Sequence, residues 1–183
     1  MLYLLGGSPR AGKSTIGRKF TSETGIPYFG LDYLKMGIAR GWPESGVDPN
    51  GGDLKIAKKI WPVVKGMAMT LVEEGEDCLL EGTYLLPEYV VELQQMYKDK
   101  IRACFIGYTE IDTWEKVRQI REYGMPSGAL SWVKGEGDRE NVEFLKRFSV
   151  YIKDECNKYS LTYFENASDH WGTVAEVARF LKG

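Results

Sequence analysis

The segment from Gly7 to Ser14 constrains this chain more than any other part of it. It reads Gly-Ser-Pro-Arg-Ala-Gly-Lys-Ser, which matches the phosphate-loop pattern GxxxxGK followed by Ser or Thr. Glycines let backbone N–H groups turn inward around a phosphate, a lysine reaches the β and γ phosphates, and a serine hydroxyl binds Mg²⁺. The sequence therefore predicts a nucleotide site made by these residues: Gly7, Ser8, Pro9, Arg10, Ala11, Gly12, Lys13, Ser14 and Thr15.

The residues on either side of this segment supply the context that the pattern requires. Residues 1 to 5 form an apolar run that predicts a buried parallel strand, and Ile16 and Phe20 mark one face of a helix that Gly25 would end. A helix in this position points its positive end at the bound anion. We therefore prefer nucleotide binding to the alternative, a glycine-rich turn that contains a lysine incidentally.

Length and charge limit the classes of protein to consider. A chain of 183 residues with 43% hydrophobic residues can bury one full core, so we expect a single domain over residues 1–183. The net charge of −2 gives no general attraction to nucleic acid or to acidic membranes, and no apolar run approaches the ~20 residues of a membrane span. We therefore expect neither nucleic acid nor a membrane as a partner.

The three cysteines, Cys78, Cys104 and Cys156, indicate the compartment. Their spacing is unlike that of metal ligands, and the first two lie in apolar runs. They are typical of buried thiols in a reducing environment. Since residues 1 to 5 also lack the charged start of a secretion signal, we expect a cytoplasmic protein.

Asp32 is the first candidate catalytic residue. A short apolar run over residues 26 to 31 predicts a second strand, and Asp32 follows it directly. Ligands of open α/β sheets bind at the carboxyl edge of the strands, so a carboxylate there faces the bound ligand. The alternative is a structural role for Asp32 as the N-cap of a helix that begins at Tyr33.

Residues 35 to 53 are rich in glycine and proline, which predicts a mobile loop. Because this stretch follows Asp32, we expect an acceptor-binding insertion over about residues 35–75, in which Arg40 and Trp42 contact a ligand. A loose surface loop explains the same composition equally well. From Asp53, apolar residues at helical spacing predict a long helix that Pro62 should kink or split.

Glu81 is the second candidate acid. It ends the short apolar run that begins at Cys78, which predicts a third buried strand. In phosphate-loop enzymes an acid at such a strand end often orients Mg²⁺ or its water, so we expect Ser14 and Glu81 to hold the metal. A structural acid is the alternative. Whether Asp32 or Glu81 is the catalytic base stays open at this point.

The remainder of the chain continues the alternation of strands and helices. Apolar runs predict strands over residues 101–107 and 161–165. Helical patterns begin at Pro87 and recur over 142–156 and 174–181. The whole chain therefore predicts an α/β fold, a five-stranded parallel sheet with helices on both faces.

Two polar segments follow the last predicted strands. Thr109 and Asp112 form a capping pair for the next helix, which is expected to point three side chains toward the core: Trp114, Val117 and Ile120. Residues 166–169 form a polar loop at the same edge of the sheet, where they are expected to border the adenine of a nucleotide.

Arg118 and Arg121 fall on one face of the helix after Asp112. A glycine-rich stretch follows them, so we expect a lid over about residues 118–139 that brings guanidinium groups over the transferring phosphate. The alternative is a solvated helix face on which the two arginines pair with Glu115 and Glu122.

Five strands alternating with helices around a phosphate loop resemble the adenylate-kinase-like group of small phosphate-loop kinases over essentially the whole chain. Within that group, the loop followed by Phe29-Gly30-Leu31-Asp32 is similar to chloramphenicol phosphotransferase, and a loop lysine followed by an acid after strand two is also found in zeta-toxin kinases. The resemblance implies ATP and Mg²⁺ as cofactors, Asp32 as the base and Arg118 and Arg121 as lid arginines.

The function that these residues predict is an ATP-dependent phosphotransferase, which moves the γ-phosphoryl group to a hydroxyl or phosphate of a small molecule. Lys13, Asp32, Arg118 and Arg121 are the expected catalytic residues. Residues 35–53 lack the arginine-rich pattern of a nucleoside-monophosphate site, which disfavours a nucleotide acceptor.

Two other functions remain to be considered. A nucleoside or nucleotide kinase would gain support from a base-stacking pocket formed by Tyr33, Trp42 or Tyr84. A regulatory phosphate-loop NTPase would hydrolyse its nucleotide in response to a partner, but the chain lacks the NKxD run with which GTP switches read guanine. The sequence predicts neither the identity of the acceptor nor the oligomeric state.

Overall fold

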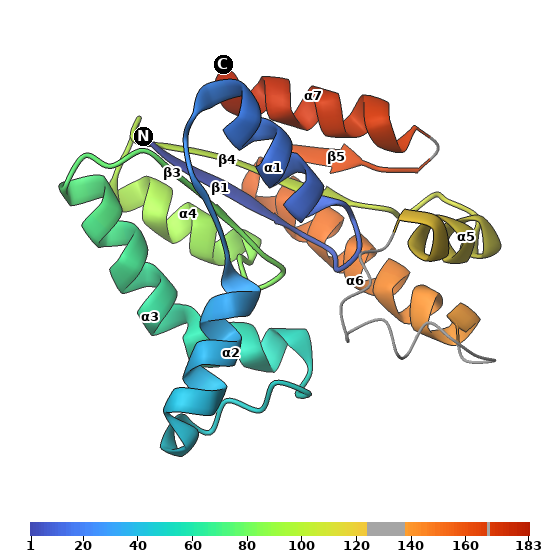
Figure 1. The fold of residues 1–183 in the computed structure, drawn as a ribbon, viewed down its shortest axis with the longest axis horizontal. Helices are drawn as coiled ribbons and strands as arrows, with labels where there is room; N and C mark the ends of the chain where they lie inside the picture. The colour runs from blue at the N-terminus through green and yellow to red at the C-terminus, as the bar shows by residue number, and fades with distance from the viewer. Residues whose placement is uncertain (124–137, 168) are drawn as a thin grey trace.

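The computed structural model describes residues 1–123, 138–167 and 169–183. In chain order the elements of these ranges are β1 (Leu2–Gly7), α1 (Lys13–Thr24), β2 (Tyr28–Gly30), α2 (Leu31–Gly41), the short 3₁₀ helix η1 (Pro43–Ser45), α3 (Asp53–Glu73), β3 (Cys78–Glu81), α4 (Pro87–Met96), β4 (Ile101–Gly107), α5 (Thr113–Tyr123), α6 (Asp138–Tyr159), β5 (Tyr163–Glu165) and α7 (His170–Lys182). Helices and strands alternate along most of the chain (Figure 1).

The five strands form one parallel sheet in the order β2-β3-β1-β4-β5. Strand β1 is central, and Leu4 lies opposite Leu80 of β3 and Ala103 of β4. A central parallel strand is covered on both faces, which explains why β1, β3 and β4 read as continuous apolar runs. The predicted sheet is confirmed; β2 to β5 lie within the predicted segments, and β1 extends two residues beyond its predicted end, to Gly7.

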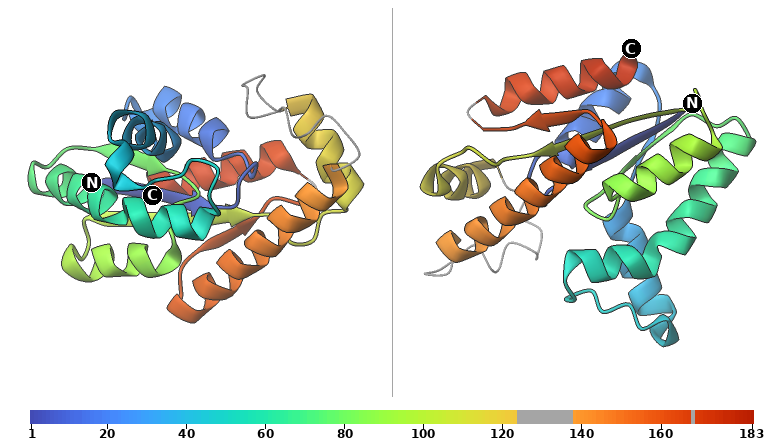
Figure 2. Two further views of the ribbon diagram at one scale, coloured as in Figure 1. Left: turned by 90° about the horizontal axis from the view of Figure 1, so that it is seen from below. Right: turned by 180° about the vertical axis from the view of Figure 1, so that it is seen from behind.

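Successive residues of β1 point to opposite faces of the sheet, and this divides the core into two layers. Leu4 packs with side chains of α3, α4 and α6 on one face, whereas Leu5 packs with side chains of α1 and α7 on the other. Figures 1 and 2 show α1 and α7 above the sheet in the first view, with α3, α4 and α6 below it. The prediction of helices on both faces is therefore confirmed.

Helix α2 occupies residues that the sequence predicted as a mobile loop. Of residues 35 to 53, those up to Gly41 continue α2, and η1 takes up Pro43–Ser45. Leu34 and Ile38 pack against the core, and burying them offsets the ~1 kcal/mol that a glycine costs inside a helix. The prediction of one loop over 35 to 53 is wrong because spaced apolar residues outweighed the glycine content.

Helix α3 passes through Pro62 without a break. Figure 1 shows the helix changing direction along its length, so the predicted kink fits and the predicted split is wrong. Ile60, Trp61 and Val64 lie on either side of the proline and are buried, and Trp61 stacks on Tyr89 of α4 at 4.3 Å between ring centroids. Their burial offsets the roughly 3 kcal/mol cost of a proline inside a helix.

The start of helix α5 differs from its predicted capping pair. Oδ1 of Asp112 accepts hydrogen bonds from the backbone N–H groups of Trp114 and Glu115, so Asp112 alone caps the helix. Val117 and Ile120 are buried as predicted, whereas Trp114 is 59% exposed. The prediction for Trp114 is wrong because its side chain, one residue after the start of the helix, is left largely in solvent.

All three cysteines are buried and free, as predicted. None of the helices in the described ranges combines the length and the apolar character that a membrane span requires.

Candidate active site

The phosphate loop joins central strand β1 to helix α1. Gly7 and Gly12 have φ angles of 128° and 99°, which L side chains rarely adopt. A Cβ on Gly7 would lie 1.9 Å from the carbonyl oxygen of Ile106, so only glycine fits between β1 and β4. Gly12 gives helix α1 no side-chain cap, which leaves the N–H groups of its first turn to an anion.

Lys13 is folded over the phosphate loop and is 7% exposed. Its Nζ donates hydrogen bonds to the carbonyl oxygens of Gly7 and Ser8, at 3.2 and 2.8 Å, and to Oγ1 of Thr83 at 3.2 Å. Burial lowers the pKa of Lys13, and the nearby carboxylate of Glu81 acts in the opposite direction. A phosphate at this position would stabilise the charged lysine in the same way.

Ser14 and Glu81, the two predicted metal ligands, are in direct contact. The hydroxyl of Ser14 donates a 2.8 Å hydrogen bond to Oε1 of Glu81, which is 6% exposed. Burial raises the pKa of Glu81, while Lys13 and the hydrogen bond from Ser14 lower it. No group of three or more His, Cys, Asp or Glu side chains in the described ranges forms a metal site. Because Mg²⁺ at nucleotide sites takes one or two protein ligands and completes its shell with phosphates and water, the pair fits Mg²⁺.

Asp32 lies in the first turn of α2, since β2 ends at Gly30. It is therefore a helical residue and not the N-cap of the alternative prediction. Gly30 pairs with Glu81 in the sheet, so the turn into α2 places Asp32 at the edge where Glu81 also ends its strand. The Asp32 side chain is 70% exposed, and its Oδ1 is 3.2 Å from Nζ of Lys35 and 3.3 Å from the hydroxyl of Tyr84.

Lys35 and Asp53 also face this site, and sequence reasoning missed both. The Lys35 side chain is 13% exposed and lies over the Tyr84 ring, 5.4 Å from its centroid. Burial raises the pKa of Asp53, Lys13 and Lys35 lower it, and the like charge of Asp32 raises it further. The position of Lys35, one turn after Asp32 on a helix, was a usable signal, but a helix beginning at Tyr33 was considered only as the alternative role of Asp32.

Arg118 forms the surface ion pair that the sequence left as the alternative. Its side chain is 68% exposed, and its Nε and Nη2 donate hydrogen bonds of 2.9 and 2.7 Å to the carboxylate of Glu115, with Glu122 4.0 Å away. Arg121 is exposed on the same helix. Most of the predicted lid, residues 124–137, lies outside the described residues, so the catalytic role of both arginines stays a prediction.

The buried cation of α5 is Lys116, which is 2% exposed. Its Nζ lies 4.0 Å from the ring centroid of Tyr108, and the hydroxyl of Tyr108 donates a 2.8 Å hydrogen bond to the carbonyl oxygen of Pro9. Burial lowers the pKa of Lys116 to about 8, against the opposite effect of Glu165. Helix α5 is therefore joined to the phosphate loop through a lysine that sequence reasoning missed.

The loop after β5 packs against the phosphate loop. Asn166 is fully buried, and its Nδ2 donates a 2.9 Å hydrogen bond to the carbonyl oxygen of Ala11 and lies 3.0 Å from Nδ1 of His170. A Cβ on Gly12 would lie 2.8 Å from Cε1 of His170. Burial, and to a lesser extent Lys116, lower the pKa of His170. Oδ1 of Asn166 is buried and finds no hydrogen-bond partner in the described part of the chain.

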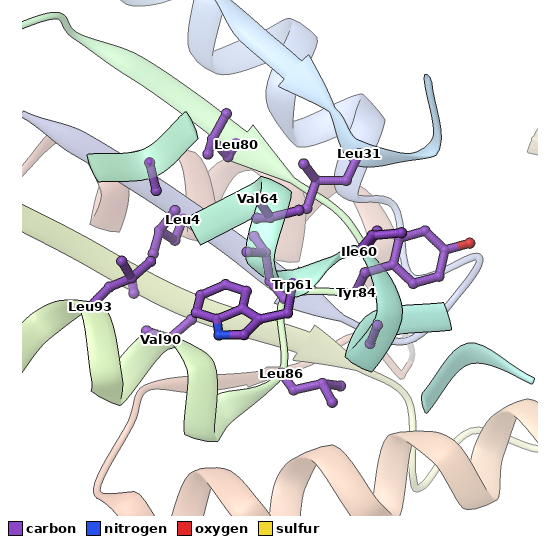
Figure 3. Packing of buried hydrophobic residues seen from close by; sticks show 14 of the residues in the cluster. Leu4, Leu31, Ile60, Trp61, Val64, Leu80, Tyr84, Leu86, Val90 and Leu93 are labelled. Carbon is purple, nitrogen blue, oxygen red and sulfur yellow. The ribbon is translucent and has the colours of Figure 1, made fainter. Parts of the chain in front are cut away.

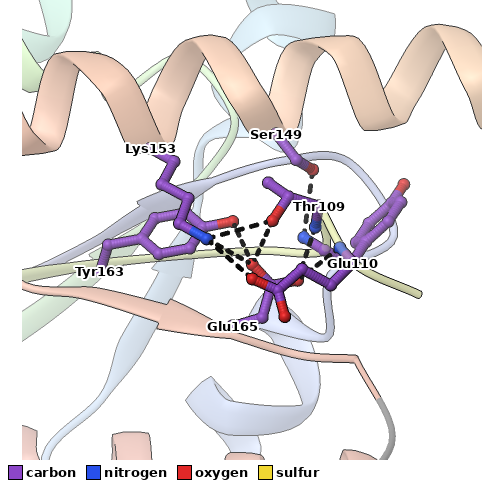
Figure 4. A network of polar contacts seen from close by, with 7 residues as sticks. Thr109, Glu110, Ser149, Lys153, Tyr163 and Glu165 are labelled. Atoms are coloured by element: carbon purple, nitrogen blue, oxygen red, sulfur yellow. Dashed lines mark hydrogen bonds and ion pairs between the residues drawn. The ribbon is translucent and has the colours of Figure 1, made fainter.

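Glu165 also ends a strand, but its carboxylate is bonded to other groups of the protein. It accepts hydrogen bonds from the backbone N–H and the hydroxyl of Thr109 and lies 3.5 Å from Nζ of Lys153 (Figure 4). Lys153 also reaches the hydroxyl of Thr109, so the turn after β4 is tied to β5 and α6. Glu165 is therefore structural, and Thr109 serves this network and not the predicted capping pair.

The three aromatic residues named for a base-stacking pocket differ in exposure and do not stack on one another. Tyr84 is 4% exposed, whereas Tyr33 and Trp42 are 75% and 56% exposed. No ring contact joins any two of them among the residues that the structure describes. These contacts do not test stacking of a nucleobase on one of the three rings, so the nucleoside-kinase alternative stays a prediction.

A scan against models of known protein families gives no match, and a search among curated proteins gives none either. Among solved structures, a gluconokinase from Sinorhizobium meliloti 1021 matches with a TM-score of 0.62 at 14% identity, over 98% of this chain and 90% of its own. Shikimate kinases from Bacteroides thetaiotaomicron and Aquifex aeolicus match with TM-scores of 0.58 and 0.54, at 16% and 17% identity. Both matches cover 100% of this chain; they cover 99% of the Bacteroides kinase and 97% of the Aquifex kinase.

At such identities the likeness establishes the fold. The chain has the phosphate-loop fold of these small-molecule kinases over its whole length, as the resemblance to the adenylate-kinase-like group implied. The narrower resemblance to chloramphenicol phosphotransferase and zeta-toxin kinases stays a prediction.

Proposed function

We propose that this chain is a kinase that transfers the γ-phosphoryl group of ATP to a hydroxyl group of a small molecule. The observation that carries the proposal is the convergence of Lys13, the bonded pair of Ser14 and Glu81, and Asp32 at one edge of the sheet. The structural neighbours named as gluconokinase and shikimate kinase support the same reaction class.

The nucleotide is held by the phosphate loop and the first turn of α1. Lys13 leaves the carbonyl oxygens that it bonds in the loop and neutralises charge on the β and γ phosphates. This electrostatic stabilisation is strongest in a site from which water is excluded. Ser14 and Glu81 would hold Mg²⁺, which would supply positive charge against the negative charge that develops on the phosphates. Arg118 and Arg121 belong to the lid in this proposal and approach the transferring group when it closes.

The polar segment after β5 is expected to border the adenine of the nucleotide. Asn166 is fully buried and donates a hydrogen bond to the carbonyl oxygen of Ala11, so it holds this segment against the phosphate loop. The preference for ATP over GTP rests on the sequence, which lacks the NKxD run that reads guanine.

Asp32 is the general base of the proposed reaction. Its exposed carboxylate takes the proton of the acceptor hydroxyl as the oxygen attacks the γ-phosphorus. Glu81 is a weaker candidate for this role because it is buried against Ser14 and Lys13. Asp32 thus orients the acceptor, and Glu81 serves the metal.

Charges around Asp32 favour an alcohol over a phosphate as the acceptor. Asp32 and Asp53 are like charges that face the same space, and Lys35 already pairs with Asp32. An anionic acceptor would meet both carboxylates as well as the γ-phosphate, at a cost that a neutral or cationic alcohol avoids. An acceptor-binding role for residues 35–75 follows, since Lys35 and Asp53 belong to that range.

The proposal is tested by a screen of alcohols, including polyols and amino alcohols, for ATP consumption. We expect one class of alcohols to be phosphorylated, and no nucleoside monophosphate. Lys13→Ala and Asp32→Asn serve as inactive controls. A chain that binds ATP, phosphorylates nothing and hydrolyses ATP only with a protein partner would instead be a regulatory NTPase.

We also expect the protein to act in the cytoplasm, where its three buried thiols remain reduced, without nucleic acid as a partner.

A further inference from the structure

We propose that Tyr84 and Lys35 are positioning residues, which hold Oδ1 of Asp32 and thereby present its Oδ2 to the hydroxyl of the acceptor. The inference rests on the proposed function, because it assigns the oxygen through which the proposed base acts. It adds to the site Tyr84 and Lys35, two residues that lie outside the phosphate loop.

Both contacts of Asp32 fall on the same oxygen. Nζ of Lys35 lies 3.2 Å from Oδ1, and the hydroxyl of Tyr84 donates a 3.3 Å hydrogen bond to Oδ1. Oδ2 receives no hydrogen bond or ion pair from any residue that the structure describes. A carboxylate anchored through one oxygen keeps the lone pairs of the other in a fixed direction.

The two donors come from side chains that cannot easily move. Tyr84 is 4% exposed, and Figure 3 shows its ring beside Ile60 with the hydroxyl at the outer edge of the apolar cluster. Lys35 is 13% exposed and lies over the same ring. Asp32 by contrast is 70% exposed, so without these donors it would sample several rotamers.

The phenol of Tyr84 is suited to act as a permanent donor. Burial and the carboxylates of Asp32 and Asp53 raise its pKa, so it keeps its proton throughout the working range of pH. Four other charged groups face Asp32 from the surrounding elements, namely Arg10 of the phosphate loop, Lys13 of α1, Asp53 of α3 and Glu81 of β3.

The assigned oxygen gives a balanced transfer step. The O–H bond of the acceptor breaks, and its proton goes to Oδ2 of Asp32. The acceptor oxygen forms the new O–P bond, and the bond between the γ-phosphorus and the bridging oxygen breaks with its electron pair left on ADP. Tyr84 and Lys35 stay bonded to Oδ1 and exchange no proton.

Three variants test the positioning role. Tyr84→Phe removes only the hydroxyl and keeps the buried ring, Lys35→Met removes the charge and keeps the side-chain stem, and Lys35→Arg restores a cation. Tyr97→Phe is the matched control for the first, because Tyr97 donates to Glu73 on the protein surface. Lys65→Met is the control for the second, because Lys65 pairs with Glu92 away from the site.

The first measurement does not depend on catalysis. Three-bond couplings of the Asp32 Cγ to the backbone N and carbonyl carbon, in isotopically labelled protein, report the χ1 rotamer populations. We expect one rotamer in the unaltered chain, averaging in Tyr84→Phe and Lys35→Met, and one rotamer in Lys35→Arg and in both controls. Unchanged couplings in Tyr84→Phe and Lys35→Met would overturn the proposal, whatever the chain phosphorylates.

The second measurement uses the alcohol that the screen finds to be phosphorylated best. We expect kcat to fall about tenfold in Tyr84→Phe and in Lys35→Met, with the KM for ATP unchanged, since a misplaced base affects the transfer step. Averaged rotamers with an unaltered kcat would disprove the catalytic part of the inference. If no alcohol is phosphorylated, the proposed function fails and the catalytic part falls with it, while the couplings still decide whether Tyr84 and Lys35 hold Asp32.

Discussion

The hydroxyl of Ser14 donates a hydrogen bond to Oε1 of Glu81 across 67 positions of the sequence. Ser14 is in the first turn of α1, which follows central strand β1, and Glu81 ends the neighbouring strand β3. Parallel strands that lie side by side end at the same edge of the sheet, so the topology brings the two side chains together. This contact links the phosphate loop to the rest of the site.

Replacing Lys13 with alanine should abolish phosphoryl transfer, with a loss of at least ~100-fold in rate. Lys13 is the buried cation of the phosphate loop, and no other side chain of the loop bonds in the same way to its carbonyl oxygens. Turnover of ATP with the best acceptor, together with calorimetric ATP binding, measures the effect. Lys19→Ala, on the outer side of the same helix, should leave both quantities unaltered. Transfer at the normal rate by Lys13→Ala would show that the loop does not hold the reacting phosphates.

Replacing Asp32 with asparagine should preserve ATP binding and reduce transfer by about 10²–10⁴-fold. The amide keeps the size of the side chain and its bond from Tyr84 but cannot take a proton, and general-base catalysis contributes this range of rate. Binding is measured by calorimetry and transfer by single-turnover kinetics. A variant that transfers phosphate at the unaltered rate would falsify the assignment of Asp32 as the base.

Replacing Glu81 with glutamine should raise the Mg²⁺ concentration for half-maximal activity by about tenfold. The amide keeps the hydrogen bond from Ser14 but removes the charge that attracts the metal. Activity is titrated against Mg²⁺ at saturating ATP, and the exposed Glu76→Gln is the control. An unchanged Mg²⁺ requirement combined with loss of transfer would instead favour Glu81 as the base.

Replacing Lys116 with methionine should stabilise the chain at pH 7, and the gain should shrink as the pH rises. Burial lowers the pKa of Lys116 from 10.5 to about 8. Below pH 8 the lysine is charged in both states, and the folded chain bears the full cost of burying it. Between about pH 8 and 10.5 the unfolded chain binds more protons, so the folded state gains stability with pH.

Urea unfolding of both chains at several pH values from 7 to about 10.5 measures this difference. It should reach at most about 3 kcal/mol at pH 7, because one pKa unit corresponds to about 1.4 kcal/mol, and the contact with Tyr108 offsets part of it. Lys58→Met, at an exposed position, is the matched control. A constant difference for Lys116→Met would mean that Lys116 titrates as an ordinary lysine.

The sheet could be predicted because each strand carries its own signal. The apolar runs that begin at Leu2, Cys78 and Ile101 became β1, β3 and β4, and parallel strands buried on both faces must be apolar throughout. The helices with clear apolar spacing were also predicted, among them α6 and α7. Helix α2 entered only as the alternative role of Asp32, and residues from 35 onward were predicted as a loop because of their glycines, although the apolar residues of α2 pack against the core.

The residues of the candidate site also fall into two groups, those that the sequence predicted and those that it did not. The phosphate loop was predicted in full, and the proximity of Ser14 and Glu81 followed from a motif and a strand end. Lys35 contacts Asp32, and Lys116 contacts the ring of Tyr108. Neither lysine belongs to a recognisable motif, and the role of each depends on which face of its helix is buried.

The sequence by itself determined the α/β fold, the phosphate loop and the acids at the strand ends, because the spacing of apolar residues and the φ angles that glycine permits are local properties. Only the tertiary structure decided which side chains meet. It joined Asp32 to Tyr84 and Lys35, tied Arg118 to Glu115, and set Asn166 against the phosphate loop. Such contacts depend on strand order and helix packing, which bring together residues from distant parts of the chain.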